Sequence, residues 1–194
     1  MKTNLNHDLS GKKVAILATD GFEQDELLSP LEALKAAGAE VHVISPNEGK
    51  IKGWKDADWG KKVKVDVVLS DANPEDYDAL VLPGGVMNPD HLRRDMLALE
   101  FVKAFFREGK PVGAICHGPW TLIDAGVVRG RKVTSYDSIQ TDLKNAGAEW
   151  VDEMVVVDNG LVTSRKPDDL PAFNAKLIEE IAEGVHARRP VMAA

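Results

Sequence analysis

The only cysteine of the chain, Cys116, stands in a turn that could make its thiol a nucleophile. A short apolar run, 111–115, leads into it, His117 follows at once, and a helical pattern opens at Gly118. Such a strand-to-helix turn is a nucleophile elbow with cysteine in place of serine, and it needs small neighbours, which Ala114 and Gly118 supply. The helix N-terminus is expected to lower the thiol pKa. A lone cysteine is more often a small buried apolar residue, but this pattern favours a reactive thiol. We predict that Cys116 is the nucleophile.

Two glycines, Gly84 and Gly85, follow a predicted strand and precede a predicted helix, without the G-x-G-x-x-G spacing of a dinucleotide site. A plain tight turn needs only one glycine, whereas two allow backbone N–H groups to approach a ligand. We predict that the amides of Gly85 and His117 form an oxyanion hole. The His117 side chain could lie on the surface, but an elbow directs it toward the same crevice, and we interpret it as functional.

Glu23 and Glu26 lie in the first turns after the first predicted strand. Acidic residues are common there because they complement the helix dipole. If one of them faces Cys116, repulsion from a thiolate raises the carboxyl pKa. A protonated carboxyl could then donate a hydrogen bond to the sulfur and transfer a proton.

The amino-acid composition limits which binding partners and which cellular compartment are expected. A net charge of −7 and the scattered positions of the basic residue pairs argue against a nucleic-acid binding partner. A single cysteine forbids an internal disulfide and suits a reducing cytoplasm. The first ten residues hold no apolar signal, and no later run is long enough to cross a bilayer, so we expect a cytoplasmic protein without a membrane partner. The four other histidines are His7, His42, His91 and His186, and none of them has the spacing of metal ligands. We therefore predict no metal and no cofactor.

The hydrophobic pattern predicts one domain that alternates strands and helices. Residues 1–10 are expected to form a loose arm, and the core to span about 12–187 of the 194 residues. Predicted strands cover 13–18, 39–44, 79–82, 111–115 and 132–135, with a hairpin at 154–164. Predicted helices cover 23–37, kinked or delayed by Pro30, then 89–107, 119–125, 139–146 and 167–186. Residues 51–54 are expected to form a short edge strand and 62–66 a half-exposed strand. Trp54 and Trp59 could be packing or pocket residues, and packing is the default interpretation.

This alternation is typical of an α/β three-layer sandwich of flavodoxin type, with a mostly parallel central sheet and helices on both faces. Ligands bind such sheets beyond the carboxyl ends of the strands. Residues 20–26, Gly84-Gly85 and Cys116-His117 all lie at such ends. We therefore expect three stretches that are remote in sequence to form one crevice.

Together these stretches resemble the PfpI family, whose superfamily includes the Parkinson-disease-linked deglycase. The resemblance spans nearly the whole chain from about Lys13. It is carried by residues 20–27, 82–85 and 114–119, and by the segments 129–131, 144–148 and 163–171.

The resemblance implies roles for several residues. Cys116 is implied as the nucleophile, His117 as its partner and Glu26 as the protonated carboxyl on the thiol, with Glu23 close by. Gly84 and Gly118 support the turn. The family also places an acidic residue after the Pro-Gly-Gly turn against the histidine of a neighbouring subunit, and Asp90 stands nearest to that position. We therefore expect a homodimer or a higher homo-oligomer.

Members of the family act on glyoxals or glycated groups, act as intracellular peptidases, or serve as stress proteins with an oxidisable cysteine. The chain has no His-x-Glu pair near 164–167, which argues against a glutaminase. We expect a stress-response enzyme that acts on small aldehydes or glycated groups, because an aldehyde is the least demanding electrophile for one thiol. Two alternatives stay open, a cysteine peptidase with peptide substrates and a redox sensor or chaperone without turnover.

Overall fold

Five apolar runs of the sequence form adjacent parallel strands of one sheet in the computed structural model, which describes residues 7–187. Every neighbouring pair of strands is parallel except β11–β12, which lies at one edge of the sheet and is antiparallel. The seven strands lie in the order β11 (Val155–Asp158), β12 (Leu161–Ser164), β8 (Val112–Ile115), β7 (Ala79–Leu82), β1 (Lys13–Leu17), β3 (Glu40–Ser45) and β6 (Val67–Val68). Taken in chain order, the five main parallel strands follow the 2-1-3-4-5 sequence of flavodoxin-like folds, as predicted.

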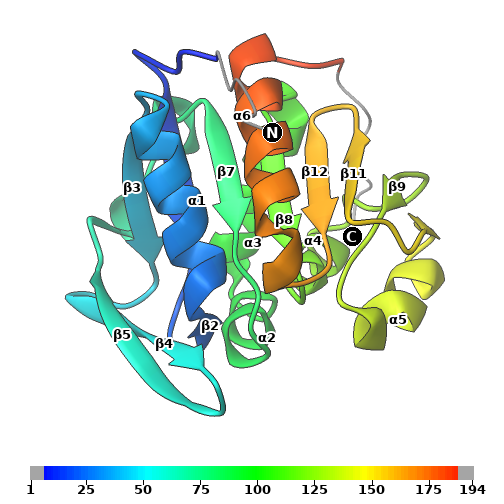
Figure 1. Cartoon of the computed structure of the whole chain (residues 1–194), viewed down its shortest axis with the longest axis horizontal. Coiled ribbons are helices and arrows are strands. Elements are labelled where there is room, and N and C mark those ends of the chain that lie inside the picture. The colour runs from blue at the N-terminus through cyan, green and yellow to red at the C-terminus, as the bar shows by residue number, and fades with distance from the viewer. Residues whose placement is uncertain (1–6, 188–194) are drawn as a thin grey trace.

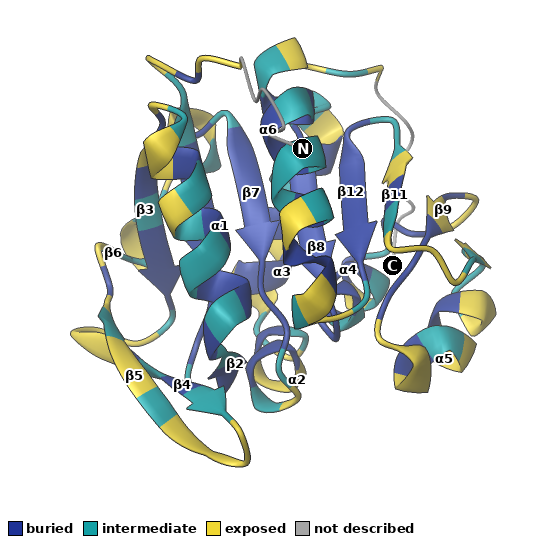
Figure 2. Cartoon of the chain, viewed as in Figure 1, coloured by how far each residue is buried: buried dark blue, intermediate teal, exposed yellow. Residues whose placement is uncertain are grey.

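Helices cover both faces of this sheet (Figure 1). The helices α1 (Gln24–Ala36) and α6 (Leu170–Glu183) pack together on one face, while α2 (Met87–Leu92), α3 (Met96–Glu108) and α4 (Pro119–Asp124) cover the other. Side chains of β1 alternate between the two cores, with Val14 and Ile16 on the α1 side and Ala15 and Leu17 on the α3 side. The central strands are therefore buried on both faces (Figure 2). The predicted fold class is confirmed.

Two helix predictions differ from the structure. The expected helix at 89–107 is two helices, because Asp95 caps α3 by accepting hydrogen bonds from the N–H groups of Leu97 and Ala98. Pro30 neither delays α1 nor ends it, since the helix runs through it from 24 to 36. Its first residues are capped by the side chain of Glu23.

The stretch 45–74 forms a small sheet beside the main one. Strands β4 (Lys50–Lys55) and β5 (Asp58–Lys64) are an antiparallel pair, and β2 (Phe22–Glu23) adds to β4 in parallel. Trp54 and Trp59 face each other across β4 and β5, with ring centroids 5.4 Å apart in an edge-to-face arrangement. The two rings pack on each other, although Trp59 is 43% exposed. The 3₁₀ turns η1 (Leu69–Asp71) and η2 (Pro74–Asp76) lead to β7.

The C-terminal half forms the predicted hairpin. Asn159 and Gly160 join β11 to β12 with positive φ at both positions. The expected strand at 132–135 is shorter, and β9 (Lys132–Val133) pairs only with β10 (Glu149–Trp150) outside the main sheet. Between them lie η3 (Asp137–Ile139) and α5 (Gln140–Asn145). After η4 (Pro167–Asp169), helix α6 ends at Glu183, three residues before the predicted end, because Gly184 takes φ +88°.

Residues 7–10, the described part of the arm that was expected to be loose, are attached to the fold. Leu9 is fully buried, and its N–H donates to the carbonyl of Ala37 at 2.8 Å. Residues 1–6 of that prediction lie outside the described residues. Within residues 7–187, no helix is long and apolar enough to cross a membrane.

Candidate active site

The three predicted stretches meet at the carboxyl ends of β1, β7 and β8. Strands β1 and β7 are adjacent at the point where the strand order reverses, and β8 is the next neighbour of β7. Glu26 enters from the first turn of α1, Gly84 and Gly85 follow β7, and Cys116 and His117 follow β8. The three stretches therefore meet as expected, and their role as one functional site stays a prediction.

Cys116 occupies the apex of a sharp turn with a φ of +62°, a strained conformation for a residue with a side chain. The turn is held by two backbone bonds, from Cys116 N–H to the carbonyl of Ser164 at 3.0 Å and from Gly118 N–H to that of Ile115 at 2.8 Å. A Cβ atom at Gly118 would lie 2.6 Å from the carbonyl oxygen of Leu82, so only glycine fits there. The geometry is that of the predicted nucleophile elbow.

Glu26 is fully buried against the thiol. Its Oε2 accepts a hydrogen bond from the N–H of Gly84 at 2.9 Å, whereas its Oε1 is buried without a hydrogen-bond partner among the described residues. Gly84 lies between the two reactive side chains, because a Cβ there would be 2.5 Å from Glu26 Oε2 and 2.7 Å from Cys116 Cβ. Burial, and then the charge of Glu23, raise the pKa of Glu26 to about 8. A protonated carboxyl beside the sulfur was the predicted arrangement.

The thiol pKa changes in the direction opposite to the prediction. Cys116 is only 6% exposed, and burial followed by the charge of Glu26 raises its pKa above the ordinary value. The backbone N–H groups of Gly85 and His117 act in the other direction by hydrogen bonding toward the sulfur. Desolvation outweighs the helix N-terminus here, and the expected low pKa is wrong for this chain by itself. The same two amides are those predicted for the oxyanion hole.

His117 contacts the nucleophile through one ring nitrogen and a serine through the other. Nδ1 lies 3.2 Å from Cys116 Sγ, and Nε2 lies 3.1 Å from Ser138 Oγ. The ring stacks on Tyr136 at 4.8 Å between centroids and meets the edge of Trp120 at 5.2 Å. Burial lowers the pKa of His117, so the neutral imidazole is favoured near pH 7.

Glu23 and Asp90 have different places. Glu23 caps α1 through a 2.9 Å bond from Glu26 N–H to its Oε2, and burial raises its pKa. The charge of Glu23 raises the pKa of Glu26, which in turn raises the pKa of the Cys116 thiol. Asp90 lies exposed on α2, while Nε2 of His117 faces Ser138 within the chain. The role of Asp90 across a subunit interface stays a prediction.

Sequence reasoning missed three residues of the site. Asn88 is fully buried and fixes the Gly84 turn, because its Oδ1 accepts from Thr19 N–H at 2.8 Å and its Nδ2 donates to the carbonyls of Pro83 and Gly84. Tyr136 and Ser138 arrive from the irregular segment after β9. An asparagine three residues after Gly85 could have been noticed, but no local pattern marks the other two.

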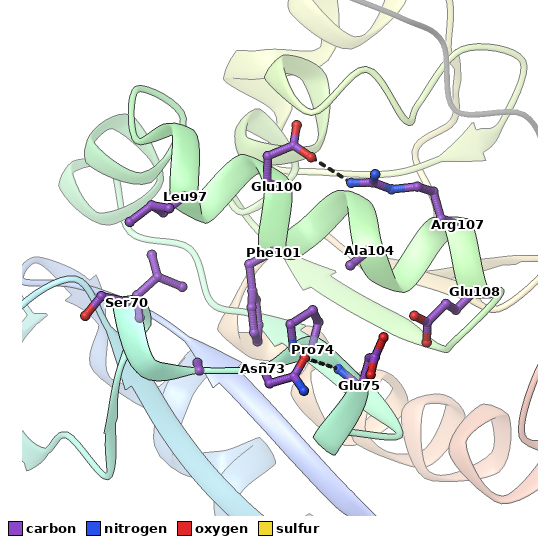
Figure 3. A pocket seen from close by; sticks show the side chains of 12 residues that line it. Ser70, Asn73, Pro74, Glu75, Leu97, Glu100, Phe101, Ala104, Arg107 and Glu108 are labelled. Carbon is purple, nitrogen blue, oxygen red and sulfur yellow. Dashed lines mark hydrogen bonds and ion pairs between the residues drawn. The ribbon is translucent and has the colours of Figure 1, made fainter.

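Two cavities differ in their relation to this site. One of about 280 Å³ lies beside His117, where Tyr136, Asp137, Arg165 and Lys166 contribute to its walls. Another of about 440 Å³ lies between α3 and residues 69–75, and Figure 3 shows the Glu100–Arg107 ion pair at its rim. None of the side chains around the second cavity belongs to the predicted site. Neither cavity is lined by Cys116 or His117, and the first is connected to the site only through Tyr136, which stacks on His117.

Comparison with known proteins places this geometry in a family. The sequence profile of the DJ-1/PfpI family matches residues 12–180. The chain belongs to the DJ-1/PfpI family. Protein/nucleic acid deglycase 2 of Escherichia coli is 49% identical over 169 residues, which cover 86% of this chain and 96% of that protein. YraA of Bacillus subtilis, named provisionally as a cysteine protease, is 50% identical over 84% of this chain and 94% of its own.

A solved structure of the same family has the same fold. The crystal structure of DJ-1beta from Drosophila melanogaster superposes with a TM-score of 0.81 at 29% identity, covering 88% of this chain and 90% of that one. The predicted family resemblance is confirmed.

Proposed function

We propose that this chain is a cysteine-dependent enzyme that acts on glyoxals and on glycated groups. The observation that carries the proposal is the set of groups around Cys116 Sγ. These are a carboxyl with a pKa of about 8, a neutral imidazole at 3.2 Å and two backbone N–H groups. The name of the Escherichia coli relative as a deglycase supports the substrate class.

The first step is addition of the thiol to an aldehyde carbon. Since Nε2–H of His117 donates to Ser138 in one tautomer, Nδ1 then presents a lone pair to the S–H proton. The sulfur bonds to the carbonyl carbon while its proton passes to Nδ1. The resulting oxyanion forms beside the N–H groups of Gly85 and His117, which stabilise it. A neutral thiol with a raised pKa fits this mechanism, because the base removes the proton only as the bond forms.

The second step divides according to substrate. With methylglyoxal, a proton shift from the thiol-bearing carbon to its neighbour converts the hemithioacetal to a thioester, and water releases lactate and the thiol. With a glycated amine in its hemiaminal form, the sulfur bonds to the carbon that carries the nitrogen, the carbon–nitrogen bond breaks, and the nitrogen takes the thiol proton and leaves as the free amine. The hemithioacetal that remains follows the same proton shift and hydrolysis. Glu26 is close enough to the sulfur to exchange protons in both sequences.

Two alternatives have support of their own. The name of YraA favours a peptidase, but an amide needs a stronger acid at its leaving nitrogen than this site offers. A redox sensor needs only an oxidisable thiol. The name of the Escherichia coli relative also includes nucleic acid, so a glycated nucleotide belongs among the substrates to be tested, although the composition predicts no nucleic-acid partner.

The proposal is tested by assaying purified protein with methylglyoxal, a glycated amino acid, a glycated nucleotide and a fluorogenic peptide. We expect release of lactate and of free amine, and no peptide cleavage. Cys116→Ser should abolish turnover and keep the fold, because a hydroxyl is a far weaker nucleophile. His91→Gln is a matched control for His117→Gln, since His91 lies exposed on α2.

Each outcome separates the candidates. Turnover retained in Cys116→Ser would exclude the thiol mechanism. Peptide cleavage without lactate or amine would favour the peptidase, and oxidation of the thiol without turnover of any substrate would favour the sensor.

A further inference from the structure

A second group of chemically capable side chains lies at the opposite end of the sheet from Cys116. Glu180 and Glu183 come from the last turns of α6, and His186 follows three residues after the helix. One ligand atom from each of the three lies within 4.8 Å of the others. The spacing Glu-x-x-Glu-x-x-His was not recognised in the sequence, from which no metal was predicted.

The backbone brings His186 back over the sheet. Gly184 takes φ +88° after the helix, and His186 N–H then donates to the carbonyl of Gly109 at 2.8 Å. Asn159 Nδ2 donates to the carbonyl of Ala187 at 2.6 Å. The imidazole packs directly on Gly160, where a Cβ atom would lie 2.7 Å from His186 Cδ2. The backbone at Gly109 and at Gly160, neither of which has a side chain, therefore holds the His186 ring in place.

The ring nitrogen that faces the carboxylates has no hydrogen-bond partner. His186 Nε2 is inaccessible to solvent and lies 3.3 Å from Glu180 Oε2, yet the pair does not meet the geometry of a hydrogen bond. Glu180 is 7% exposed, and burial raises its pKa. A buried ring nitrogen without a hydrogen bond thus lies next to a buried carboxyl, whose own contact with the N–H of Gly160 leaves that nitrogen's desolvation uncompensated.

This separation is the one expected for two ligands of a single ion. Zinc binds imidazole nitrogen and carboxylate oxygen at about 2.0–2.2 Å, and tetrahedral angles then place ligand atoms roughly 3.3–3.6 Å apart. Glu183 is exposed and supplies a third oxygen on the solvent side. One nitrogen and two oxygen ligands leave a fourth position for water.

We propose that Glu180, Glu183 and His186 bind a divalent cation of the zinc type, which fastens residues 184–187 to α6 and to the β11–β12 turn. Two of the ligands lie beyond residue 180, where the family match ends. The site lies at the other end of the sheet from Cys116 and shares no residue with it. The N–H of Gly160 contacts the Glu180 carboxyl and orients it from outside the site.

Calorimetric titration of the chelator-treated full chain with zinc chloride tests the proposal. The Cys116→Ser protein is used so that zinc cannot bind at the thiol. We expect saturable binding of one ion per chain. His186→Ala and Glu183→Gln should each weaken it by more than about tenfold. Glu179→Gln is the matched control, because Glu179 pairs with Lys176 on the same helix, and its affinity should be unchanged.

Thermal unfolding gives a second measurement. Zinc should raise the Tm of the Cys116→Ser protein and of its Glu179→Gln variant, but not that of its His186→Ala variant. An ordinary Glu180–His186 ion pair predicts otherwise, namely that zinc leaves the Tm of the Cys116→Ser protein unchanged, while His186→Ala lowers that Tm equally with and without zinc. That result, absence of saturable binding, or equal affinity in all variants would overturn the proposal.

Discussion

Glu26 and Cys116 are two acids in one buried space, and they do not both lose their protons near neutral pH. The pKa of Glu26 lies at about 8, mainly because of burial, and the charge of Glu26 raises the pKa of the thiol in turn. At pH 7 the carboxyl is therefore mostly protonated and the thiol neutral. The site therefore holds both protons at pH 7.

A first prediction concerns the stability of Glu26→Gln. The folded-state pKa of about 8 exceeds the ordinary value of 4.5, so the stabilising proton is fully bound below pH 4.5. The stability that it contributes is lost as the pH rises to 8. The amide has no such dependence. Above pH 8, Glu26→Gln should exceed the wild type in free energy of unfolding by on the order of a few kcal/mol. Urea unfolding at pH 5 and pH 9 measures this difference.

The same substitution should lower activity while it raises stability at high pH. An amide cannot exchange protons with the sulfur, and loss of a general acid or base typically costs at least about 10²-fold in rate. A merely structural Glu26 would instead give a Gln variant with normal turnover. Lactate release from methylglyoxal, measured from pH 6 to 9, distinguishes the two roles.

At the scale of the elements, the turn after β7 must approach the elbow after β8 more closely than a side chain allows. A Cβ at Gly84 would lie 2.5 Å from Glu26 Oε2 and 2.8 Å from the carbonyl oxygen of Ile115. Asn88 holds this turn in place, because its Nδ2 donates hydrogen bonds to the carbonyl groups of Pro83 and Gly84. The absence of a side chain at Gly84 is what brings the carboxyl and the thiol together.

We predict that Gly84→Ala destabilises the fold by about 1–3 kcal/mol, because the backbone carbonyl cannot move aside without strain, and that it removes most of the activity. Gly130→Ala is the control. Nothing lies within 4 Å of a Cβ there, but φ is +70°, so it should cost about 1–2 kcal/mol with activity unchanged. Urea midpoints and lactate assays measure both. Equal loss of activity in the two variants would contradict a specific role for Gly84.

The elements that the sequence predicted well are those whose pattern is local. Continuous apolar runs such as 79–82 identify strands buried on both faces, and the elbow needs small residues beside Cys116 whatever surrounds it. The break before α3 was missed because Asp95 within a helical pattern looks like any polar surface residue. Ser138 and Tyr136 were missed because only the packing of the segment after β9 brings them to His117. The direction of the thiol pKa was wrong because burial depends on tertiary packing.

At the scale of the whole molecule, large apolar side chains are exposed in the segment that follows the Gly84-Gly85 turn. Val86 is 56% exposed directly after Gly85, and Met96 and Leu97, at the start of α3, are 67% and 58% exposed. Asp90 lies exposed on α2 between them in the sequence. Exposed large apolar side chains can mark a surface that contacts another protein. We therefore predict that this face forms a two-fold interface in which Asp90 of one subunit reaches His117 of the other.

Mixing inactive variants tests this arrangement. Within one chain, Ser138 is the group that meets Nε2 of His117, and a carboxylate from a second subunit would hold the imidazole in one orientation more firmly than a hydroxyl does. We expect Asp90→Ala to lose most of its activity. Mixed with inactive Cys116→Ala, it should recover a part, because each mixed dimer has one site with both groups intact. His91→Ala, next to Asp90 on the same helix, is the control and should stay active. If mass spectrometry shows exchanged subunits and the mixture stays inactive, the catalytic groups belong to a single chain and Ser138 alone orients His117.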